Sequence, residues 1–283
     1  MNTPVLQRFD LTGRAVVITG AGGALCGAMA DALASMGAKV ALLDIDLERV
    51  EIRAQAIIQA GGVALAFGCD VLDPAQLQRC CDSISAAWGE PDLLINGAGG
   101  NDPRASTTVE FAQPLPQDQK TQSFFDLDPD SFRQVFDLNF MGTFLTTQVF
   151  SRAMVAAGRG SIVNISSMSA FMPLTKVAAY SAAKAAVSNF TQWLAVHFSH
   201  AGVRVNALAP GFFMTEQLRF LHVDQATGKL LPRAVKVIAH TPMGRYGTAD
   251  DLIGALVWLL SDASSFVTGV VVPIDGGFSS YSI

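Results

Sequence analysis

The sequence predicts a doubly wound α/β fold, with a seven-stranded parallel sheet and helices on both of its faces. Two observations predict it. Short apolar runs alternate with longer stretches of helical periodicity along the chain, and most of these runs are apolar throughout rather than at every second residue. A run of that kind is typical of a strand buried on both faces of a parallel sheet. Strand, helix and strand in repeated order form the Rossmann arrangement.

The expected elements follow from the positions of these runs. Asp73-Pro74 and Asp128-Pro129 each place a capping carboxylate before a proline at the first helical position, which marks two of the helix starts. The strands are expected at 15–19, 40–43, 63–67, 93–95, 161–165, 203–208 and 270–272. The helices are expected near 25–36, 47–60, 74–88, 129–157, 178–200 and 248–261.

The domain organisation is expected to be simple. The chain has 283 residues, and no linker, low-complexity tract or internal repeat interrupts the alternation, so we expect a single domain spanning residues 1–283. Two segments, 100–124 and 212–248, do not fit the alternation. Because long loops within a compact domain are usually functional, we expect both of them near the mouth of an active site.

Composition excludes several classes of protein. Half of the residues are hydrophobic and the net charge is −5, which does not match a basic surface for nucleic acid or for an anionic membrane. The first residues show no secretory signal, and the apolar run 252–260 is too short to span a bilayer. The four cysteines lack zinc-ligand spacing, so we expect buried thiols, no metal site and a cytoplasmic location.

A glycine-rich turn follows the first expected strand and opens the first expected helix. Glycines at this point let the backbone approach a pyrophosphate, while the helix N-terminus supplies N–H groups and the positive end of the helix dipole. Its position after the first strand of a doubly wound fold favours a dinucleotide site over a plain tight turn. The candidate contacts are Gly20, Gly22, Gly23, Ala24 and Leu25.

Three further strand ends carry candidate cofactor contacts. Asp44 ends the second strand, where a carboxylate can accept hydrogen bonds from an adenosine ribose and would repel a 2′-phosphate, so we expect NAD as the cofactor. Asp70 and Val71 follow the third strand, where a carboxylate can meet the adenine amine. The fourth strand ends in small residues that would let the cofactor pass: Asn96, Gly97, Ala98 and Gly99.

Tyr180 and Lys184 lie four residues apart, on one face of an expected helix. Bringing a phenol from a pKa near 10 to about 7 takes roughly 4 kcal/mol, which one ammonium about 4 Å away supplies at an effective dielectric of about 20. The pair is therefore a plausible proton-transfer device. Ser167, thirteen residues before Tyr180, follows the fifth strand and could hold the oxygen of a substrate.

Taken together, these motifs resemble the short-chain dehydrogenase/reductase family over nearly the whole length of the sequence. The resemblance adds Asn139 and the group Pro210, Gly211, Phe213 and Thr215. It implies a nicotinamide cofactor, a homotetramer, and a set of roles. Tyr180 would transfer the proton, Lys184 would lower the Tyr180 pKa and bind the nicotinamide ribose, Ser167 would orient the substrate, and Asn139 would hold a relay water. From the residues alone, Asn139 could equally mark a helix kink.

One stretch departs from the family pattern. The common turn has glycine at the positions of Ala24 and Cys26, whereas this chain has glycine at 22, 23 and 27. The departure leaves the individual pyrophosphate contacts open but not the cofactor itself. Alanine is small, and the helix N-terminus remains.

A narrower resemblance concerns the substrate. GGALCGAMA, GAGGNDPRA, the run from Phe124 to Thr143, the run from Ser166 to Phe198, APGFF and HTPMGR look like the D-mannonate oxidoreductases of the short-chain type, or fructuronate reductases. This resemblance implies hydride transfer to the ketone of a hexuronate. The alternatives are a gluconate 5-dehydrogenase-like or other polyol dehydrogenase, and a catalytically silent dinucleotide-binding sensor.

A hexuronate carboxylate needs a cation or backbone donors when it leaves water. Lys176 is the first candidate because it lies in the connection that leads to the catalytic helix, and Arg104 is the second because its loop follows the fourth strand. Lys120 and Arg245 are further possibilities. The neutral residues that could bind sugar hydroxyls are Asn101, Ser169 and Thr175.

Overall fold

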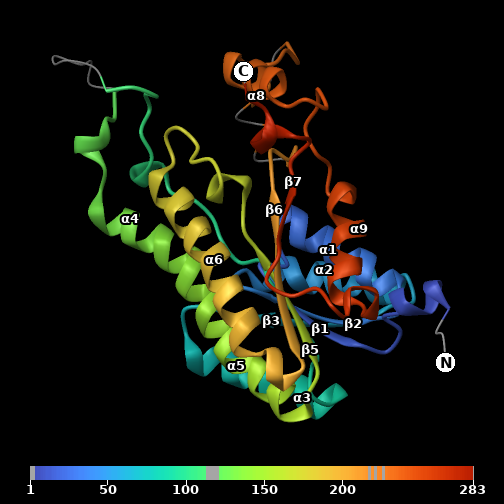
Figure 1. Cartoon of the computed structure of the whole chain (residues 1–283). Helices are drawn as coiled ribbons and strands as arrows, with labels where there is room; N and C mark the ends of the chain where they lie inside the picture. Colours follow the sequence, from blue (N-terminus) through green and yellow to red (C-terminus); the bar gives the residue numbers. More distant parts are fainter. Residues whose placement is uncertain (1–3, 113–120, 216–217, 220–221, 225–226, 283) are drawn as a thin grey trace.

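The structure is a computed structural model that describes residues 4–112, 121–215, 218–219, 222–224 and 227–282. Within these residues, seven strands form one sheet in the order β3-β2-β1-β4-β5-β6-β7, and every neighbouring pair is parallel. This confirms the expected Rossmann fold (Figure 1). The strands are β1 Ala15–Thr19, β2 Lys39–Asp44, β3 Val63–Gly68, β4 Leu93–Asn96, β5 Gly160–Ile165, β6 Val203–Pro210 and β7 Val271–Ile274.

Helices cover both faces of the sheet because successive strand residues point to opposite sides. Val16 and Ile18 of β1 pack into one apolar cluster, with side chains of α1, α2 and α9. Val17 packs into a second cluster on the other face, with side chains of α3, α5 and α6. Figure 1 shows these two groups of helices on either side of the strands. Their bounds are α1 Ala24–Ser35, α2 Leu47–Gln59, α3 Pro74–Trp88, α5 Gly142–Ala157, α6 Ala178–His197 and α9 Asp250–Leu260.

The stretch 129–157 differs from the single helix that periodicity predicted. It contains α4 Pro129–Phe136 and α5, joined by a π-helical turn at Asp137–Met141. The Gly142 N–H donates to the Asp137 carbonyl, five residues back. The Asn139 amide donates to the Val135 carbonyl at 2.8 Å, so a side chain takes part of the hydrogen bonding that a regular α-helix gives to its backbone. Such turns are frequent at functional sites.

The segment 212–248, which did not fit the alternation, contains a helix that the sequence did not predict. This is α8 Pro232–His240, which begins with a proline at its first position. Lys236 of α8 pairs with Glu110 in the other exceptional segment, at 3.3 Å between Nζ and Oε2. The two segments therefore meet in space, beyond the carboxyl ends of the central strands (Figure 1).

Candidate active site

The site begins between β1 and β4, at the switch point of the strand order. The strands β1 to β3 extend from this point toward one edge of the sheet, and β4 to β7 extend toward the other. Thr19 ends β1, and its Oγ1 accepts hydrogen bonds from the N–H groups of Gly97 at 3.0 Å and Ala98 at 3.2 Å. Gly20 has a φ of +68°, and a Cβ added there would lie 2.9 Å from the Ala98 backbone. Only glycine suits that conformation and that close approach, and a crevice at this switch point is where doubly wound sheets bind ligands.

The start of α1 faces the same crevice. Gly23 caps the helix without a side-chain hydrogen bond, so the first N–H groups, which include those of Ala24 and Leu25, are suited to an anion. Cys26, at the position of a family glycine, is buried. A Cβ added at Gly97 would overlap its thiol, so the sulfur occupies space that a side chain directly after β4 would need.

A cavity of about 270 Å³ lies beyond β1, β2 and β4. Asp44 stands at its wall, with Oδ2 accepting from Gly22 N at 2.9 Å and Oδ1 accepting from Asp46 N at 3.0 Å. Each carboxylate oxygen keeps a further lone pair for a ribose hydroxyl. The cavity brings together six of the predicted cofactor residues: Gly20, Asp44, Asp70, Val71, Ala98 and Gly99.

The same cavity has walls that the sequence analysis did not single out. Ile45 and Leu72 directly follow predicted residues and could have been found by extending each strand-end pattern by one position. Gln134 and Leu138, which lie four residues apart on either side of the α4 boundary, carry no local signal. The additional lining residues are Ile45, Cys69, Leu72, Gln134 and Leu138.

Asn96 has a different surrounding from the residues that follow it. Its Nδ2 donates to Thr147 Oγ1 and to Asn164 Oδ1, both at 2.8 Å, and Asn164 Nδ2 donates to Thr191 Oγ1 at 2.9 Å. The Asn96 side chain thus belongs to a buried polar network that ties β4 to β5, α5 and α6. A cofactor contact from Asn96 stays a prediction.

Tyr180, Lys184 and Ser167 meet as expected. Ser167 ends the extended segment after β5, and Tyr180 is in the first turn of α6. The Lys184 ammonium is buried, donates to the Ile165 carbonyl at 2.8 Å and lies 5.6 Å from the centre of the Tyr180 ring. Burial lowers the pKa of Lys184 to about 8.

The pKa of Tyr180 differs in direction from the one expected. Burial raises it, and a hydrogen bond with Ser167 lowers it by less. The Lys184 ammonium donates to the Ile165 carbonyl at 2.8 Å and is not among the groups that lower the pKa of Tyr180. Tyr180 is therefore a protonated phenol at neutral pH, and a group of this kind is a proton donor.

Asn139 is placed beside Lys184 by the π-helical turn. Its Nδ2 donates to the Gly100 carbonyl at 2.7 Å, while its buried Oδ1 has no partner. A Cβ added at Gly99 would lie 2.5 Å from Asn139 Oδ1 and 3.3 Å from Lys184 Nζ, so both atoms border the same small volume. A water there would satisfy the Asn139 oxygen. Both interpretations of Asn139, kink and polar ligand, fit this geometry.

The predicted group at the end of β6 makes its contacts with β7 and with its own segment. Gly211 N donates to the Ile274 carbonyl at 2.9 Å, and Thr215 N donates to the Phe213 carbonyl at 2.9 Å. A Cβ added at Gly211 would lie 2.7 Å from Asp275. Phe213 is buried and lines a separate cavity of about 350 Å³. The structure therefore does not bring Pro210, Gly211, Phe213 and Thr215 into the cavity that holds Asp44.

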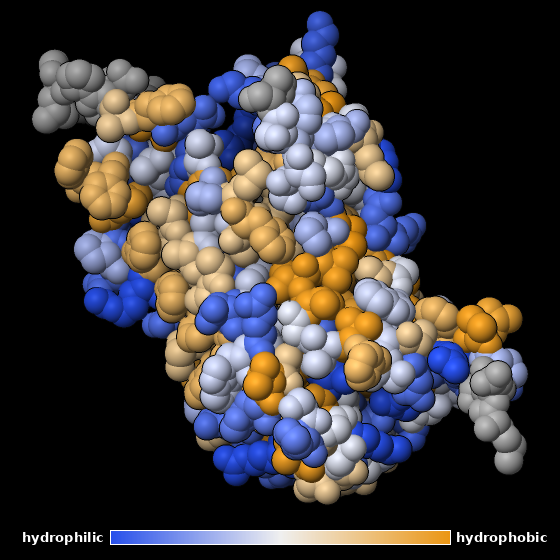
Figure 2. All heavy atoms as spheres, viewed as in Figure 1, coloured by the Kyte–Doolittle hydropathy of each residue, from blue (hydrophilic) through white to orange (hydrophobic). Residues whose placement is uncertain are grey.

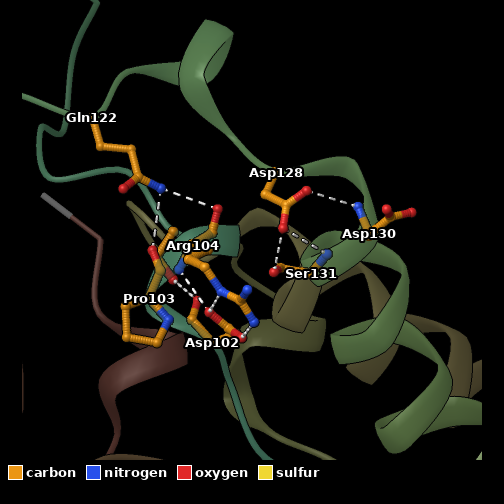
Figure 3. A network of polar contacts seen from close by, with 8 residues as sticks. Asp102, Pro103, Arg104, Gln122, Asp128, Asp130 and Ser131 are labelled. Atoms are coloured by element: carbon orange, nitrogen blue, oxygen red, sulfur yellow. Dashed lines mark hydrogen bonds and ion pairs between the residues drawn. The ribbon is translucent and has the colours of Figure 1, made fainter.

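The cations predicted to bind the substrate carboxylate lie in different environments from one another. Arg104 pairs with Asp102 at 2.9 Å (Figure 3), and its carbonyl accepts from Gln122 Nε2 at 3.0 Å and from Asp128 N at 3.1 Å. Arg245 makes two hydrogen bonds to Asp251, at 2.7 and 2.8 Å. Lys176 has a φ of +78°, and its carbonyl accepts from Thr107 N at 2.9 Å. Lys120 lies outside the described residues.

The neutral candidates also differ from one another. Asn101 Nδ2 donates to Ser106 Oγ at 2.9 Å, so its amide is already engaged. Ser169 is buried beside Ser167, and its Oγ has no hydrogen-bond partner. An unpaired buried hydroxyl next to a proton donor is suited to a polar ligand. Thr175 lines a cavity beside α8.

Two other kinds of site are absent from the part of the chain that the structure describes. It contains no group of three or more His, Cys, Asp or Glu side chains that could hold a metal ion. In the same residues, none of the helices is both long and apolar enough to cross a membrane.

Known proteins resemble this chain along nearly its whole length. The family model described as Enoyl-(Acyl carrier protein) reductase matches residues 20–279. An uncharacterised oxidoreductase of Bacillus subtilis, UxuB, is 50% identical over 274 residues, which cover 96% of this chain and 97% of that protein. A solved structure from Haemophilus influenzae, provisionally described as a D-mannonate oxidoreductase and containing NAD, is 48% identical. The match covers 96% of this chain and 97% of the H. influenzae chain, with a TM-score of 0.92.

A third similar protein is a gluconate 5-dehydrogenase from Burkholderia cenocepacia, solved with NADP and tartrate. It is 32% identical to this chain. The match covers 99% of this chain and 100% of the B. cenocepacia chain, with a TM-score of 0.83. Family match, whole-length identity and shared architecture agree. The chain therefore belongs to the short-chain dehydrogenase/reductase family, oxidoreductases that bind a nicotinamide dinucleotide and act on CH–OH groups.

Proposed function

We propose that the chain is an NAD(H)-dependent oxidoreductase that interconverts a secondary alcohol and a ketone on a sugar acid of the D-fructuronate and D-mannonate type. The observation that carries the chemistry is the cluster of Tyr180, Ser167 and Lys184, with the unpaired Asn139 oxygen beside it. The substrate class is supported by the 48% identity to the H. influenzae protein described as a D-mannonate oxidoreductase.

The reduction uses these side chains as follows. A nicotinamide dinucleotide held by these residues would supply the hydride for the ketone carbon. Ser167 holds the ketone oxygen by a hydrogen bond, and Tyr180 gives that oxygen a proton as the charge on it develops. Lys184, with one ammonium proton on the Ile165 carbonyl, has others for the nicotinamide ribose and for a water held by Asn139. Tyr180 can regain its proton through that group of atoms.

The residues of the cavity beside Asp44 fit the adenosine half of a dinucleotide. Gly20 and Gly23 allow close approach to the start of α1, and the small side chains at 97–99 leave a path toward Tyr180. Asp44 supports NAD rather than NADP, since a 2′-phosphate would meet a carboxylate. The NAD in the H. influenzae structure agrees with this preference.

The proposal also covers the oligomeric state and the cellular location of the protein. We propose a homotetramer in the cytoplasm. An aromatic row runs from Phe140 and Phe144 to Phe190 and Trp193 on α6, and the Trp193 side chain is exposed. Figure 2 shows hydrophobic side chains gathered along the outer side of the molecule where α4 and α6 lie. Apolar surface of this kind supports contact with another subunit. The four free cysteines are compatible with a reducing compartment.

Two alternatives remain in the same test. A gluconate 5-dehydrogenase or polyol dehydrogenase is favoured by the B. cenocepacia relative, and a silent dinucleotide-binding sensor is disfavoured by the complete set of Ser167, Tyr180 and Lys184. Purified protein should be assayed with NADH and NADPH against D-fructuronate, other keto-acids, gluconate and neutral polyols. Turnover of D-fructuronate with NADH supports the proposal, preference for gluconate or a polyol selects the alternative, and no turnover with any of them supports the sensor.

A further inference from the structure

A cavity of about 590 Å³ lies between the connection to the catalytic helix and α8. One wall is the segment 172–175, and the opposite wall is formed by α8 and by Phe212, directly after Gly211. Its lining combines apolar side chains and rings with two cations, the carboxylate of Glu110 and the hydroxyl of Thr175. Six residues carry the argument: Leu174, Thr175, Phe212, Arg233, Lys236 and His240.

The cavity adjoins the proposed catalytic residues through its first wall. Ser167 and Ser169 precede this wall in the chain, and Tyr180 follows it. Leu174 N donates to the hydroxyl of Ser181, the neighbour of Tyr180, at 3.3 Å, so the wall is fixed to the first turn of α6. A six-carbon substrate with its ketone at Ser167 and Tyr180 can extend into this space.

The charges in the cavity are not balanced. Arg233 and Lys236 are cationic and Glu110 is anionic, so these three side chains carry a net charge of +1. Lys236 is paired with Glu110 at 3.3 Å. Arg233 is half-buried, and no carboxylate among the described residues pairs with it. A partly buried guanidinium without a carboxylate is suited to bind an anion bidentately.

The positive charge of Arg233 affects a neighbouring titratable group. Next to it, His222 Nδ1 and Tyr246 Oη form a buried hydrogen bond of 2.7 Å. Burial lowers the pKa of His222, and the positive charge of Arg233 lowers it further. The other candidate arginines contrast with this, because Arg104 and Arg245 are each already paired with an aspartate.

We infer that Arg233 binds the carboxylate of the substrate, and that the cavity between residues 172–175 and α8 is the binding site for the acid end of the sugar. The inference rests on the proposed function. Phe212 and His240 line the same cavity, and their rings would contact the C–H groups of the carbons between carboxylate and ketone. Lys236 is held by Glu110 and contributes less to binding.

The test compares Arg233→Ala and Arg233→Gln with Lys236→Ala, which removes the same charge three residues further along α8. A hydrogen bond to a charged group contributes enough for the KM of the hexuronate to rise about 10- to 100-fold in the Arg233 variants, with the KM for a neutral ketose and for NADH unchanged. Lys236→Ala should change the hexuronate KM less than about threefold. Added guanidinium should restore part of the loss in Arg233→Ala.

Each other outcome has a defined meaning. If wild type reduces the hexuronate, but the Arg233 variants lose charged and neutral substrates equally or lose neither, the inference is overturned and the proposed function stands. If Arg233→Ala fails to fold, Arg233→Gln and Arg233→Lys give the comparison, with Arg233→Lys retaining part of the affinity. If wild type acts only on neutral polyols or ketones, both the sugar-acid function and the carboxylate subsite are contradicted.

Discussion

The two ends of the candidate site are built from different material. At the end that holds Asp44, the walls are strand termini and backbone, such as the Thr19 hydroxyl on Gly97 N–H and the Asp44 carboxylate on Gly22 N–H. At the end that holds Arg233, the walls are side chains on a helix and two loops, tied together by contacts such as Lys236 with Glu110. Strand termini are fixed by the register of the sheet, whereas the second end depends on packing between distant segments.

This difference matches the two proposed roles, with the cofactor at the Asp44 end and the substrate at the Arg233 end. The dinucleotides of the family, NAD and NADP, differ only in a 2′-phosphate, so backbone donors at strand ends can place the shared part and one residue, here Asp44, can distinguish the two. A substrate differs from one enzyme to the next, and side chains on the segments outside the sheet can change without disturbing the strands. Variants at the first end should therefore affect every substrate, and variants at the second end should discriminate among them.

Tyr180→Phe should have the largest effect. It removes the proposed proton donor and little volume, and loss of a general acid typically costs about 10²- to 10⁴-fold in rate. We expect kcat to fall by that factor for charged and neutral substrates alike, while the affinity for NADH, measured by fluorescence titration, is unchanged. Turnover within about threefold of wild type would remove Tyr180 from the mechanism.

Asp44→Ala should weaken the cofactor end in particular. The carboxylate would bind the ribose diol, and a hydrogen bond to a charged group contributes roughly 1.5–3 kcal/mol. We expect KM for NADH to rise about 10- to 100-fold and the preference over NADPH to shrink, with KM for the sugar acid unchanged. Asp44→Asn is the control, because it keeps the shape of the side chain and one acceptor oxygen while it removes the charge. A wild-type enzyme that prefers NADPH would contradict the prediction at the outset.

Gly97→Ala tests why Cys26 stands in the glycine turn. The added Cβ would overlap the Cys26 thiol and lie 2.9 Å from the Thr19 carbonyl, and overpacking of this kind typically costs about 1–3 kcal/mol. Chemical denaturation should show this loss, and Cys26→Ala in the same protein should restore part of it. Gly254→Ala in α9 is the matched control, because an added Cβ there meets no atom within 4 Å. Equal losses with and without Cys26→Ala would rule out the thiol as the cause.

The fold was predictable because its signals are local. Continuous apolar runs identified all seven strands, and capping aspartates before Pro74 and Pro129 marked two helix starts. Most of the cavity beside Asp44 was predictable for the same reason, since all of its lining residues except Gln134 and Leu138 lie at or just beyond the ends of those strands. The π-helical turn at Asn139 was not, because an apolar periodicity of about 3.6 residues does not reveal a side chain that takes the Val135 carbonyl.

The proposed substrate end was the part that sequence reasoning could not place. Arg104 and Arg245 look identical to Arg233 in the sequence, and only the fold pairs the first two with aspartates. α8 itself was missed because it is short and lies between segments without clear periodicity. Charge neutralisation of this kind depends on tertiary contacts and leaves no local pattern.

The pH dependence of stability should report the burial of Lys184. Its folded pKa of about 8 lies below the unfolded value of 10.5, so the unfolded chain binds more protons between these values and stability rises with pH in that window. From about pH 8 to about pH 10 the rise attributable to Lys184 is about 2 kcal/mol. We expect the free energy of unfolding, measured by chemical denaturation, to rise between these two pH values by about 2 kcal/mol more in wild type than in Lys184→Met. Parallel changes in the two proteins would mean that the Lys184 pKa is not lowered by folding.

Lys176 should give the smallest effect, and it separates the two cations proposed for the substrate end. Its backbone lies in the left-handed region that favours glycine, and its carbonyl, not its ammonium, holds the 100–124 segment through Thr107 N. Lys176→Gly should therefore stabilise the fold by about 0.5–1 kcal/mol in thermal denaturation, since relief of the left-handed strain exceeds the entropy that glycine adds to the unfolded state. Lys176→Ala should leave the hexuronate KM within about threefold of wild type, because Lys176 is only partly buried and does not line the cavity that holds Arg233. A rise in that KM as large as the one expected for Arg233→Ala, with the neutral ketose unaffected, would assign the carboxylate to Lys176 instead.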